Sequence, residues 1–365
     1  MYPCCPDRGR RSGRGPDPTD ASRCQPTHGD GAPGAHRMDS MRALVTGATG
    51  KVGYAIASAL LERGDQVRAL VRDPRRAASV LPAGIEPIRG DVTDAESLDA
   101  AVEGCELVFN SMGLPEQWVR DEAIFDRVNA IGSRQVAAAA RRAGVRRFVH
   151  TSTCDVFHAE TGERFDETAL ADYPKGTPYE RSKQHAEELV LAERNGMEVV
   201  ILNPSGVYGP TPSPTPSFEN GLFEPVVRKR LPAVPPGGTG YAFVEGVAAG
   251  HLLASEKGKD GDRYILADGY ASFREIAETV REAAGRGRVP PVMPVPVAKA
   301  VAGVGAGISK VIRRPPLLPR GQLTYFLWQA RPDSSKAQRE LGWQTTPLAE
   351  GVRATLDSMG LLDGS

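Results

Sequence analysis

The sequence contains few cysteines, and their spacing excludes several kinds of protein. Three of the five, Cys4, Cys5 and Cys24, lie in the first 40 residues, whereas Cys105 and Cys154 stand alone in apolar segments. This odd and irregular set excludes a disulfide framework and a zinc site. His150, His158 and His251 also lack ligand spacing, so no metal site is predicted. We expect a reducing compartment and therefore a cytoplasmic protein.

Neither charge is in excess, and no long hydrophobic run is present. Lys and Arg together number 45, as do Asp and Glu, so the formal net charge is zero. This balance argues against nucleic acid or an anionic membrane surface as the main partner. The most apolar stretch, residues 295–312, is interrupted by Lys299 and Lys310, and it predicts a packed helix rather than a membrane span.

Residues 1–40 lack apolar periodicity. They are rich in Pro, Gly, Arg and Asp, and such a segment cannot bury enough apolar surface to offset the entropy cost of ordering. They also lack the apolar run of a secretory signal. We predict a disordered N-terminal extension over residues 1–40, with a start at Met38 or Met41 as the alternative.

From residue 41 onward, short apolar runs alternate with helical patterns. Strands are predicted at residues 42–47, 66–72, 85–92, 106–110, 146–152 and 198–204, and helices at 54–64, 94–104 and 121–143. Thr93 and Glu96 are predicted to form a capping box. The alternation indicates an α/β fold with a doubly wound parallel Rossmann sheet, whose ligands bind beyond the carboxyl ends of the strands.

The composition changes after residue 210. A Pro/Ser/Thr loop at 211–221 precedes amphipathic helices at 273–285 and 348–360, and the proline-dense residues 290–322 predict an irregular cap. We divide the folded chain into a dinucleotide-binding domain, 41–210, completed by later segments, and a smaller mixed α/β substrate lobe, 211–365. Four aromatic residues are candidates for the pocket lining, although each can equally belong to the core: Trp118, Phe218, Phe223 and Tyr241.

A glycine-rich turn, "TGATGKVG", joins the first predicted strand to the first helix. Its three glycines allow a tight turn, a close approach to a pyrophosphate, and packing of the helix against the sheet. The free N–H groups of the helix N-terminus would face the anion. The turn therefore predicts a dinucleotide site at Thr46, Gly47, Ala48, Thr49, Gly50, Lys51, Val52 and Gly53.

The end of the second predicted strand bears on the choice of cofactor. Arg72 comes first and Asp73 second in "ALVRDP". A carboxylate would bind the ribose hydroxyls of NAD, whereas an arginine suits the 2′-phosphate of NADP. We predict NADP(H), with NAD(H) as the alternative, unless Arg72 is simply a solvated strand-end residue. Asp91 and Val92, after the third strand, are expected beside the adenine.

Two further stretches are candidates for the reaction chemistry. Tyr179 and Lys183 of "YERSK" are spaced i, i+4 and would share one face of a helix, although such a pair also occurs by chance. "HTSTCDVFH", residues 150–158, follows the fifth predicted strand. A strand-end hydroxyl and the Tyr/Lys pair would then converge above a bound nicotinamide.

With these motifs, the chain from residue 41 to about 361 resembles the extended short-chain dehydrogenase/reductase family, also described as the NAD-dependent epimerase/dehydratase family. Further matching stretches are "VNAIGS" (128–133), "NPSGVYGP" (203–210) and "DSSKAQRELGW" (333–343). Within the family, "VRALVRDP" and "ILNPSGVYGP" are most similar to dihydroflavonol-reductase-like members.

The resemblance implies a role for each matching residue. Tyr179 would be the proton donor or acceptor, Lys183 its partner, and Thr153 the hydroxyl that binds the substrate oxygen. A free phenol titrates near 10, and we expect the Lys183 ammonium and the nicotinamide charge to lower that pKa. The remaining implied cofactor contacts are Asn110, Ser111, Met112, Asn203, Pro204, Gly206 and Val207.

The chain also departs from the family pattern. Met112 is bulkier than the usual alanine, and Asn203 replaces the arginine of many sugar-nucleotide enzymes. Cys154 and Asp155 stand where dehydratases have an Asp–Glu pair, which disfavours dehydration. The leading hypothesis is an NADP(H)-dependent oxidoreductase acting on a CH–OH or C=O group of a bulky small molecule, similar to dihydroflavonol reductases or 3β-hydroxysteroid dehydrogenases.

Two other functions remain open. One is an NAD-dependent nucleotide-sugar epimerase, against which Arg72 and Asn203 argue. The other is a non-catalytic NADP-binding protein, which would not need an intact Thr/Tyr/Lys set. Relatives often pair through long helices of the sheet layer, so a homodimer is a further expectation that no residue pattern tests.

Overall fold

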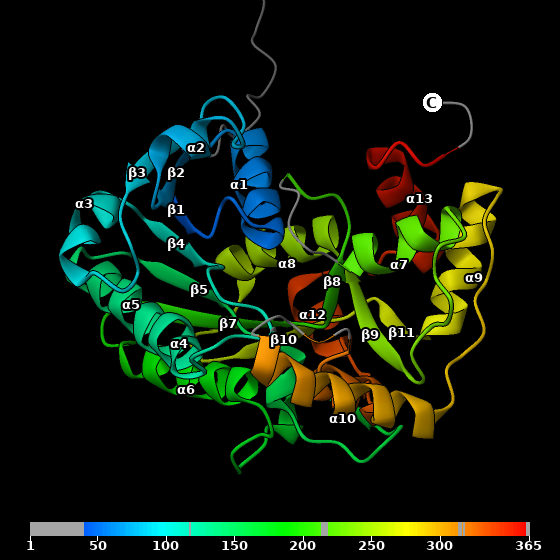
Figure 1. Ribbon diagram of the computed structural model, residues 1–365. Coiled ribbons are helices and arrows are strands. Elements are labelled where there is room, and N and C mark those ends of the chain that lie inside the picture. The colour runs from blue at the N-terminus through cyan, green and yellow to red at the C-terminus, as the bar shows by residue number, and fades with distance from the viewer. Residues whose placement is uncertain (1–39, 117, 213–217, 313–315, 317, 363–365) are drawn as a thin grey trace, which may run out of the picture. The chain divides into compact units, whose positions relative to one another are not determined.

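A parallel sheet of seven strands forms the centre of the computed structural model, which describes residues 40–116, 118–212, 218–312, 316 and 318–362 (Figure 1). The prediction for the N-terminal extension lies outside the described residues, except for Ser40. Every neighbouring pair of strands in the sheet is parallel. The strands in spatial order are β3 (Glu86–Arg89), β2 (Gln66–Val71), β1 (Arg42–Thr46), β4 (Leu107–Asn110), β5 (Arg147–Thr151), β7 (Glu198–Pro204) and β10 (Arg263–Leu266).

Side chains alternate between the two faces of this sheet, and helices cover both. Val45 of β1 lies in one buried cluster and Leu44 in another. The first cluster includes residues of α1 (Lys51–Arg63), α8 (Val244–Lys257) and α12 (Ser335–Leu341). The second includes residues of α3 (Asp99–Val102), α5 (Ser133–Arg142) and α6 (Pro178–Ala192). The predicted doubly wound α/β fold is thus confirmed.

The strand order reverses between β1 and β4. From β3, at one edge, the chain returns to place β4 on the other side of β1. In such sheets ligands bind in the crevice outside the carboxyl ends of the two strands between which the order reverses. The glycine-rich turn follows β1 and therefore lies at this position.

Most helix boundaries agree with the predictions. α1 ends at Gly64, whose φ of +94° and backbone N–H bonds to Leu60 and Leu61 end the helix in the manner of a glycine cap. The helix predicted at 121–143 consists of α4 (Ala123–Phe125), the π-helix η2 (Asp126–Gly132) and α5, which follow one another directly.

The predicted capping box of Thr93 and Glu96 is wrong. Asp94 precedes the short 3-10 helix η1 (Ala95–Ser97), and no side chain caps that helix. The Thr93 hydroxyl instead donates to the carboxylate of Asp91 at 2.8 Å, because the chain turns sharply after β3.

Strands from the carboxyl half of the chain form a second, smaller sheet. Its order is β11 (Gly269–Ser272), β9 (Gly238–Phe243) and β8 (Gly206–Tyr208). A third buried cluster joins it to α7 (Phe218–Val227), α9 (Phe273–Ala284) and α13 (Leu348–Ser358), which lie together on the right of Figure 1. The short elements that remain are α2 (Pro74–Ala78), η3 (Cys154–Val156), β6 (Arg164–Phe165), η4 (Glu167–Ala169) and β12 (Arg331–Pro332).

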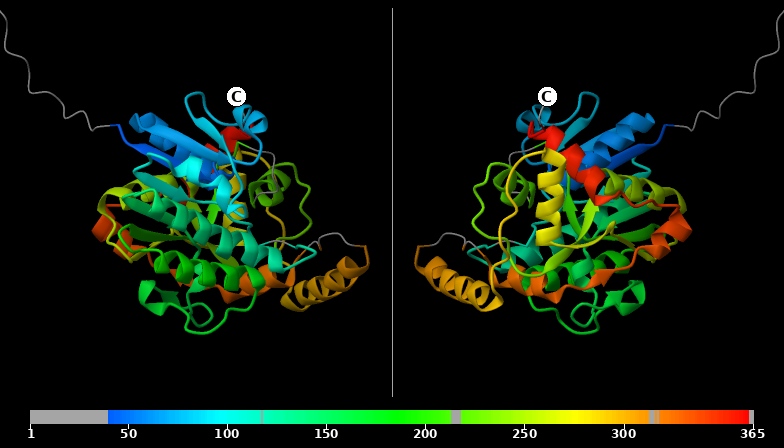
Figure 2. Two further views of the ribbon diagram at one scale, coloured as in Figure 1. Left: turned by 90° about the vertical axis from the view of Figure 1, so that its left-hand side faces the viewer. Right: turned by 90° about the vertical axis from the view of Figure 1, so that its right-hand side faces the viewer.

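The predicted irregular cap is largely helical. α10 (Val295–Ile312) and α11 (Arg320–Trp328) pack on each other through a small cluster that includes Ala298, Ala302 and Leu323. Figure 2 shows α10, in orange, at the margin of the fold. Proline is compatible with this arrangement because it is concentrated between and at the starts of the helices. None of the described helices has the length and apolar character to traverse a bilayer.

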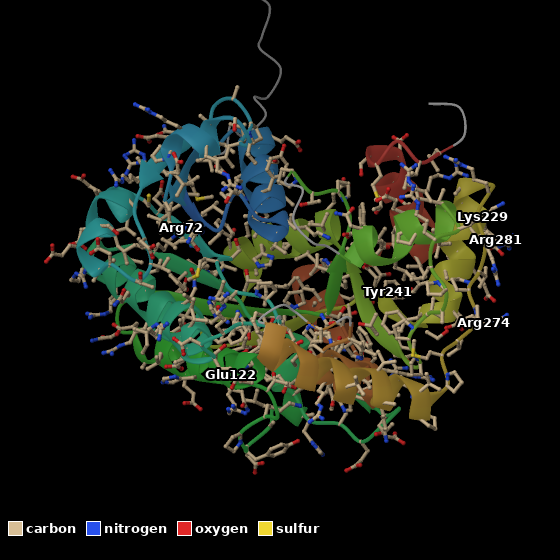
Figure 3. The ribbon with its side chains drawn as sticks, viewed as in Figure 1. Arg72, Glu122, Lys229, Tyr241, Arg274 and Arg281 are labelled. Atoms are coloured by element: carbon tan, nitrogen blue, oxygen red, sulfur yellow. The ribbon has the colours of Figure 1, made fainter. Side chains whose placement is uncertain are left out.

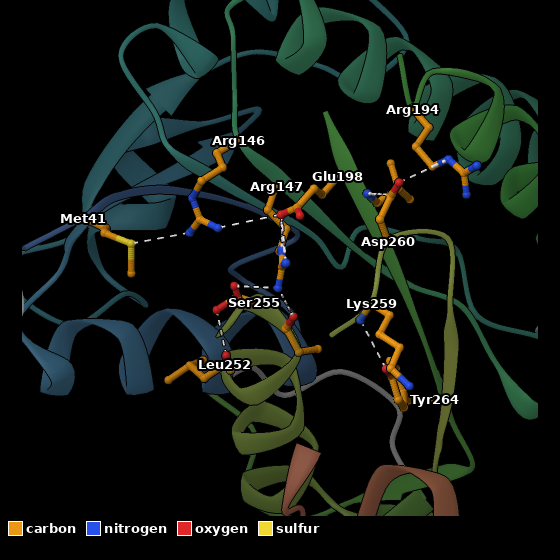
Figure 4. Close-up of polar contacts among 12 residues, drawn as sticks. Met41, Arg146, Arg147, Arg194, Glu198, Leu252, Ser255, Lys259, Asp260 and Tyr264 are labelled. Carbon is orange, nitrogen blue, oxygen red and sulfur yellow. Dashed lines mark hydrogen bonds and ion pairs between the residues drawn. The ribbon is translucent and has the colours of Figure 1, made fainter. Parts of the chain in front are cut away.

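At the opposite, amino-terminal ends of the strands, the buried Arg147 side chain joins several elements. Arg147, at the start of β5, pairs with Glu198, at the start of β7, and donates to the carbonyl oxygens of Ala254 and Ser255 at the end of α8 (Figure 4). These contacts join two strands and a helix. They stabilise the fold at the amino-terminal ends of the strands, whereas the candidate ligand site lies at the carboxyl ends.

Candidate active site

The glycine-rich turn is shaped by close backbone contacts that only glycine permits. Gly47 has φ of +70°, and the Gly50 N–H donates to its carbonyl at 2.8 Å. A Cβ atom on Gly47 would lie 2.9 Å from the Cα atom of Met112, and one on Gly53 would lie 2.3 Å from the Gly47 oxygen. The turn therefore leaves its backbone open in the way that the dinucleotide prediction requires.

Residues after β4 are fixed to this turn. The Ser111 hydroxyl donates to the Thr46 carbonyl at 2.7 Å, and the Met112 N–H donates to the Thr46 hydroxyl at 3.2 Å. The same hydroxyl donates to the buried Asn110 amide at 2.7 Å. The side chain of Met112 packs against the second core cluster, which accommodates its greater bulk.

At the end of β2, the acidic and the basic residue have different positions. Asp73 is the N-cap of α2, and its carboxylate accepts from the backbone N–H groups of Arg75 and Arg76. Arg72 is exposed beside it at the carboxyl end of the strand (Figure 3). Arg72 also contributes, after the hydrogen bond from Thr93, to a lowered pKa of Asp91.

Val92 is buried and lies next to the helical layer. A Cβ atom on Gly132 of η2 would come within 2.9 Å of its side chain. The "VNAIGS" motif thus brings a glycine to Val92. It also supplies Asn129, whose amide accepts from the Leu114 N–H at 2.7 Å and donates to Ser182 at 3.0 Å, which fixes the segment after β4 against α6.

Tyr179 and Lys183 lie in the first two turns of α6, as predicted. Thr177 and Glu180 form a capping box there, and Pro178 occupies the first helical position, so the start of the helix is well defined. The buried Lys183 ammonium donates to the Thr151 carbonyl at 2.7 Å. It lies 3.9 Å from the position that a Cβ atom would take on Gly113, the residue after Met112.

Thr153 completes the group. It is the N-cap of η3, and its hydroxyl lies close enough to Tyr179 to affect the pKa of the phenol. Thr153, Tyr179 and Lys183 therefore converge at the carboxyl end of β5. Through Gly113 and Met112 they adjoin the glycine-rich turn, so the structure brings the two predicted parts of the site together.

Burial dominates the pKa values of Tyr179 and Lys183. Burial raises the pKa of Tyr179, and the Asp155 carboxylate raises it further, whereas the neighbouring Thr153 hydroxyl acts in the opposite direction. Burial also lowers the pKa of Lys183 to about 8, against the influence of Glu187 and Asp155. Desolvation therefore sets the direction of the Tyr179 shift among the protein's own groups, and the lowering expected from Lys183 together with the nicotinamide charge stays a prediction.

Asn203, Pro204, Gly206 and Val207 lie where β7 passes into β8. The buried Asn203 amide donates to the Thr153 carbonyl at 3.0 Å and to Glu187 at 2.8 Å. Asn203 thereby supports the residue that carries the active hydroxyl. A Cβ atom on Gly206 would lie 2.8 Å from the Gly240 oxygen, so this position needs glycine to approach β9.

Two polar residues near the Thr/Tyr pair were missed as site residues. Asp155 accepts a hydrogen bond from Thr153 at 3.0 Å. Tyr325 of α11 is bonded to Thr239 at 3.2 Å, and the charge of Asp155 contributes to the raised pKa of Tyr325. The sequence signals for Asp155 were its position two residues after Thr153 and its match to the second acid of the dehydratase Asp–Glu pair. Tyr325 lies far along the chain and gave no signal.

The aromatic candidates divide into core and partly exposed residues. Phe223 is fully buried in the third cluster, and Tyr241 of β9 (Figure 3) packs against the same cluster. Trp118 is half-buried. The side chain of Phe218 lies outside the described residues.

Among the described residues, no group of three or more His, Cys, Asp or Glu side chains is arranged to hold a metal ion.

Comparisons with known proteins agree with this geometry. The profile of the NAD dependent epimerase/dehydratase family matches residues 43–267. Sterol demethylase protein B of Methylococcus capsulatus is 32% identical over 309 residues, which cover 83% of this chain and 93% of that protein. A Synechocystis sp. protein provisionally named dihydroflavonol 4-reductase is 33% identical over 317 residues, covering 85% and 92%.

Among solved structures, the fold is similar to UDP-glucose 4-epimerase of Thermus thermophilus in complex with NAD. The TM-score is 0.69 at 26% identity, and the match covers 88% of this chain and 99% of that one. The resemblance that the motifs predicted, including its dihydroflavonol-reductase-like branch, is therefore confirmed.

Proposed function

Since the chain belongs to the NAD-dependent epimerase/dehydratase family, and is an NAD(P)-dependent oxidoreductase of the extended short-chain type, we propose that it moves hydride between NADP(H) and a CH–OH or C=O group of a small molecule. The observation that carries this proposal is the convergence of Thr153, Tyr179 and Lys183 beside the glycine-rich turn. A protein that only bound the cofactor would not need this set.

The residues at the turn fit a dinucleotide. The backbone of the turn is free of Cβ atoms at Gly47 and Gly53, and the N-terminus of α1 follows it with N–H groups that suit a pyrophosphate. We assign cofactor contacts to Thr46–Gly53 as numbered above, and to Arg72, Asp91, Val92, Asn110, Ser111 and Met112. Tyr179, Lys183 and residues 203, 204, 206 and 207 complete the proposed set.

The engagement of Asp73 favours NADP(H). Oδ1 of its carboxylate accepts from two backbone N–H groups of α2, which leaves only Oδ2 for the ribose and so disfavours binding of both ribose hydroxyls by the carboxylate. Arg72, Arg75 and Arg76 are all exposed around it. This cationic group would suit a 2′-phosphate.

The three catalytic residues have distinct roles in the proposed reaction. In the reducing direction Tyr179 gives its phenolic proton to the substrate oxygen, and Thr153 donates a hydrogen bond that orients the same oxygen. Lys183 uses one N–H for the Thr151 carbonyl, which leaves two for the cofactor ribose and for stabilising the phenolate. The nicotinamide, when bound, supplies or accepts the hydride.

The proposed substrate is bulky and hydroxylated rather than a sugar nucleotide. The names of the two relatives refer to a sterol and to a dihydroflavonol. Asn203 stands where many sugar-nucleotide enzymes have arginine, and its neutral amide offers no cation to a diphosphate. Its amide N–H groups are also committed to Thr153 and Glu187.

The proposal extends to the setting of the enzyme. We propose a cytoplasmic location, which the free thiols of Cys105 and Cys154 support. We also propose that residues 41–210, completed by β10, bind the cofactor, that residues 211–365 mainly bind the substrate, and that the enzyme forms a homodimer. Light scattering of the purified protein would test the homodimer directly.

Tyr179→Phe tests the function. Turnover should fall about a thousandfold because the proton donor is lost, whereas the Kd for NADPH should change little. Tyr173→Phe is the matched control, since Tyr173 is an exposed tyrosine bonded to His158 in the segment before α6. The assay uses NADPH or NADP⁺ with a dihydroflavonol, a 3β-hydroxysteroid and UDP-glucose. Isomerisation of UDP-glucose without net redox change would favour the epimerase instead.

A further inference from the structure

The single proton of the Thr153 hydroxyl is committed to a neighbouring protein group. A threonine hydroxyl has one proton to donate and two lone pairs that accept. Here the proton is directed at Oδ2 of Asp155 at 3.0 Å, and the Asp155 backbone N–H donates to the hydroxyl oxygen at 3.3 Å. The Tyr179 phenol lies close to the same hydroxyl. With Asp155 ionised, Thr153 therefore has no proton left for a substrate oxygen.

We propose that Asp155 acts in its protonated form. Its carboxyl O–H then donates a hydrogen bond to Thr153 Oγ1, which leaves the Thr153 O–H free to donate a hydrogen bond to the substrate oxygen. This inference rests on the proposed function, because it requires an oxygen atom of the substrate between Thr153 and Tyr179. The hydrogen bonds then balance. The two lone pairs of Thr153 accept from the carboxyl and the backbone N–H of Asp155, and its proton joins that of Tyr179 at the substrate oxygen.

The surroundings of Asp155 favour the protonated carboxyl. Desolvation raises its pKa to about 7, with Glu180 of α6 as the next cause and Glu116 as a further acidic neighbour. Both glutamates are fixed: Glu116 accepts from the Thr177 hydroxyl at 2.9 Å, and Glu180 accepts from the Thr177 backbone at 2.7 Å. Two carboxylates thus face Asp155 from two different segments.

The cations near Asp155 are engaged with other groups. The Lys175 ammonium, which opposes the rise in pKa, donates to the Phe157 carbonyl at 2.7 Å and lies 4.9 Å from the centre of the Trp328 ring. Lys183 is bonded to the Thr151 carbonyl. The other titratable groups that Asp155 influences, Tyr179, Cys154 and Tyr325, are neutral in their ordinary forms.

Ionisation of Asp155 would impair the site in two ways. It would take the Thr153 proton from the substrate oxygen, and its charge would raise the pKa of Tyr179. Asp155 keeps its proton throughout the cycle, since Tyr179 supplies the one transferred to the substrate. Asp155 is therefore a positioning residue that acts through Thr153, and turnover should decline as the pH rises through about 7.

Infrared spectroscopy tests the proton on Asp155 without any substrate. The difference spectrum between the wild type and Asp155→Asn at about pH 6 should contain the carbonyl stretch of a protonated carboxylic acid. Thr153→Val should shift that band, because it removes the acceptor of the carboxyl O–H. Absence of the band, or a band that Thr153→Val leaves unmoved, would overturn the proposal.

Turnover tests the consequence, with whichever of the dihydroflavonol or the 3β-hydroxysteroid the wild type converts. Asp155→Ala should lower kcat about tenfold, and Asp155→Asn should recover most of that loss because its amide N–H can donate to Thr153. The alkaline decline near pH 7 should be absent from Asp155→Asn. A decline that persists in Asp155→Asn, or an asparagine variant no faster than the alanine variant, would contradict the inference. Failure of the wild type to convert either compound would instead count against the proposed function, and the infrared result would still decide the protonation of Asp155.

Discussion

The ammonium group of Lys51, at the start of α1, forms an ion pair with Glu219 of α7. The same Glu219 oxygen accepts the backbone N–H of Gly209 at 2.6 Å. Lys51 belongs to the glycine-rich turn, and Glu219 follows the segment after β8. The pair therefore joins the proposed pyrophosphate site to the carboxyl half of the chain. Only 3% of the Glu219 side chain is exposed, so little solvent screens the interaction.

Lys51→Met should accelerate cofactor release. Loss of the ion pair would free α7 from the turn that holds the pyrophosphate, and we expect the dissociation rate of NADPH to rise about tenfold, equivalent to about 1.4 kcal/mol. Stopped-flow displacement of NADPH, followed by its fluorescence, measures this rate. Lys259→Met is the control, because Lys259 pairs with Glu340 at an exposed position. Equal rates in the two variants would show that the Lys51 pair does not retain the cofactor.

Arg72→Ala should weaken NADPH binding selectively. The guanidinium is proposed to bind the 2′-phosphate, so the Kd for NADPH should rise about tenfold while the Kd for NADH stays within about twofold. Titration of intrinsic fluorescence with each dinucleotide gives both constants. Arg142→Ala serves as the control, since Arg142 forms a surface pair with Asp99. If both dinucleotides lost affinity equally, Arg72 would not distinguish them.

The sequence predicted best those parts of the site that depend on local geometry. The Tyr179/Lys183 pair follows from helical spacing, and the glycine-rich turn from its position between a strand and a helix. The capping box at Thr93 failed because a nearby carboxylate, Asp91, competes for the same hydroxyl. A local pattern cannot reveal such competition.

The remainder of the site depends on tertiary packing. Tyr325 comes close to Asp155 because α11 packs against β9, where Tyr325 is bonded to Thr239, and no spacing in the sequence relates Tyr325 to Asp155. The sign of the Tyr179 pKa shift was also inaccessible, since it is set by desolvation rather than by the neighbouring ammonium. The charges could be identified from the sequence, but their burial could not.

Gly53→Ala should abolish cofactor binding and lower stability, whereas Gly50→Ala should have a smaller effect. A Cβ atom at residue 53 would lie 2.3 Å from the Gly47 oxygen, which must then move and distort the turn. At residue 50 the nearest atom, the same oxygen, would be 3.3 Å away. Calorimetric titration with NADPH and thermal unfolding of both variants test this difference. Similar losses in the two variants would mean that the turn can rearrange around a side chain.

His251 should make the protein less stable in acid. Its Nδ1 faces the Val247 carbonyl at 2.8 Å and therefore carries the proton, while Nε2 accepts from the Thr151 hydroxyl at 2.8 Å. This neutral ring is fully buried, and burial lowers its pKa from 6.5 to about 4. Because the unfolded chain takes up a proton more readily than the folded one, this contribution to the free energy of unfolding is complete above about pH 6.5 and is lost as the pH falls to about 4.

The loss from His251 amounts to about 3 kcal/mol. Urea unfolding of the wild type and His251→Gln at a series of pH values measures it, and the free energy of unfolding of the variant should fall less steeply between about pH 6.5 and 4. His158→Gln is the control, since His158 is exposed, and it should retain the slope of the wild type. Parallel curves for the wild type and His251→Gln would show that the buried ring takes up its proton without unfolding. In that case the Thr151 hydroxyl would have a partner other than neutral His251 at low pH. The end of β5, whose Thr151 carbonyl accepts from Lys183, would then not depend on His251.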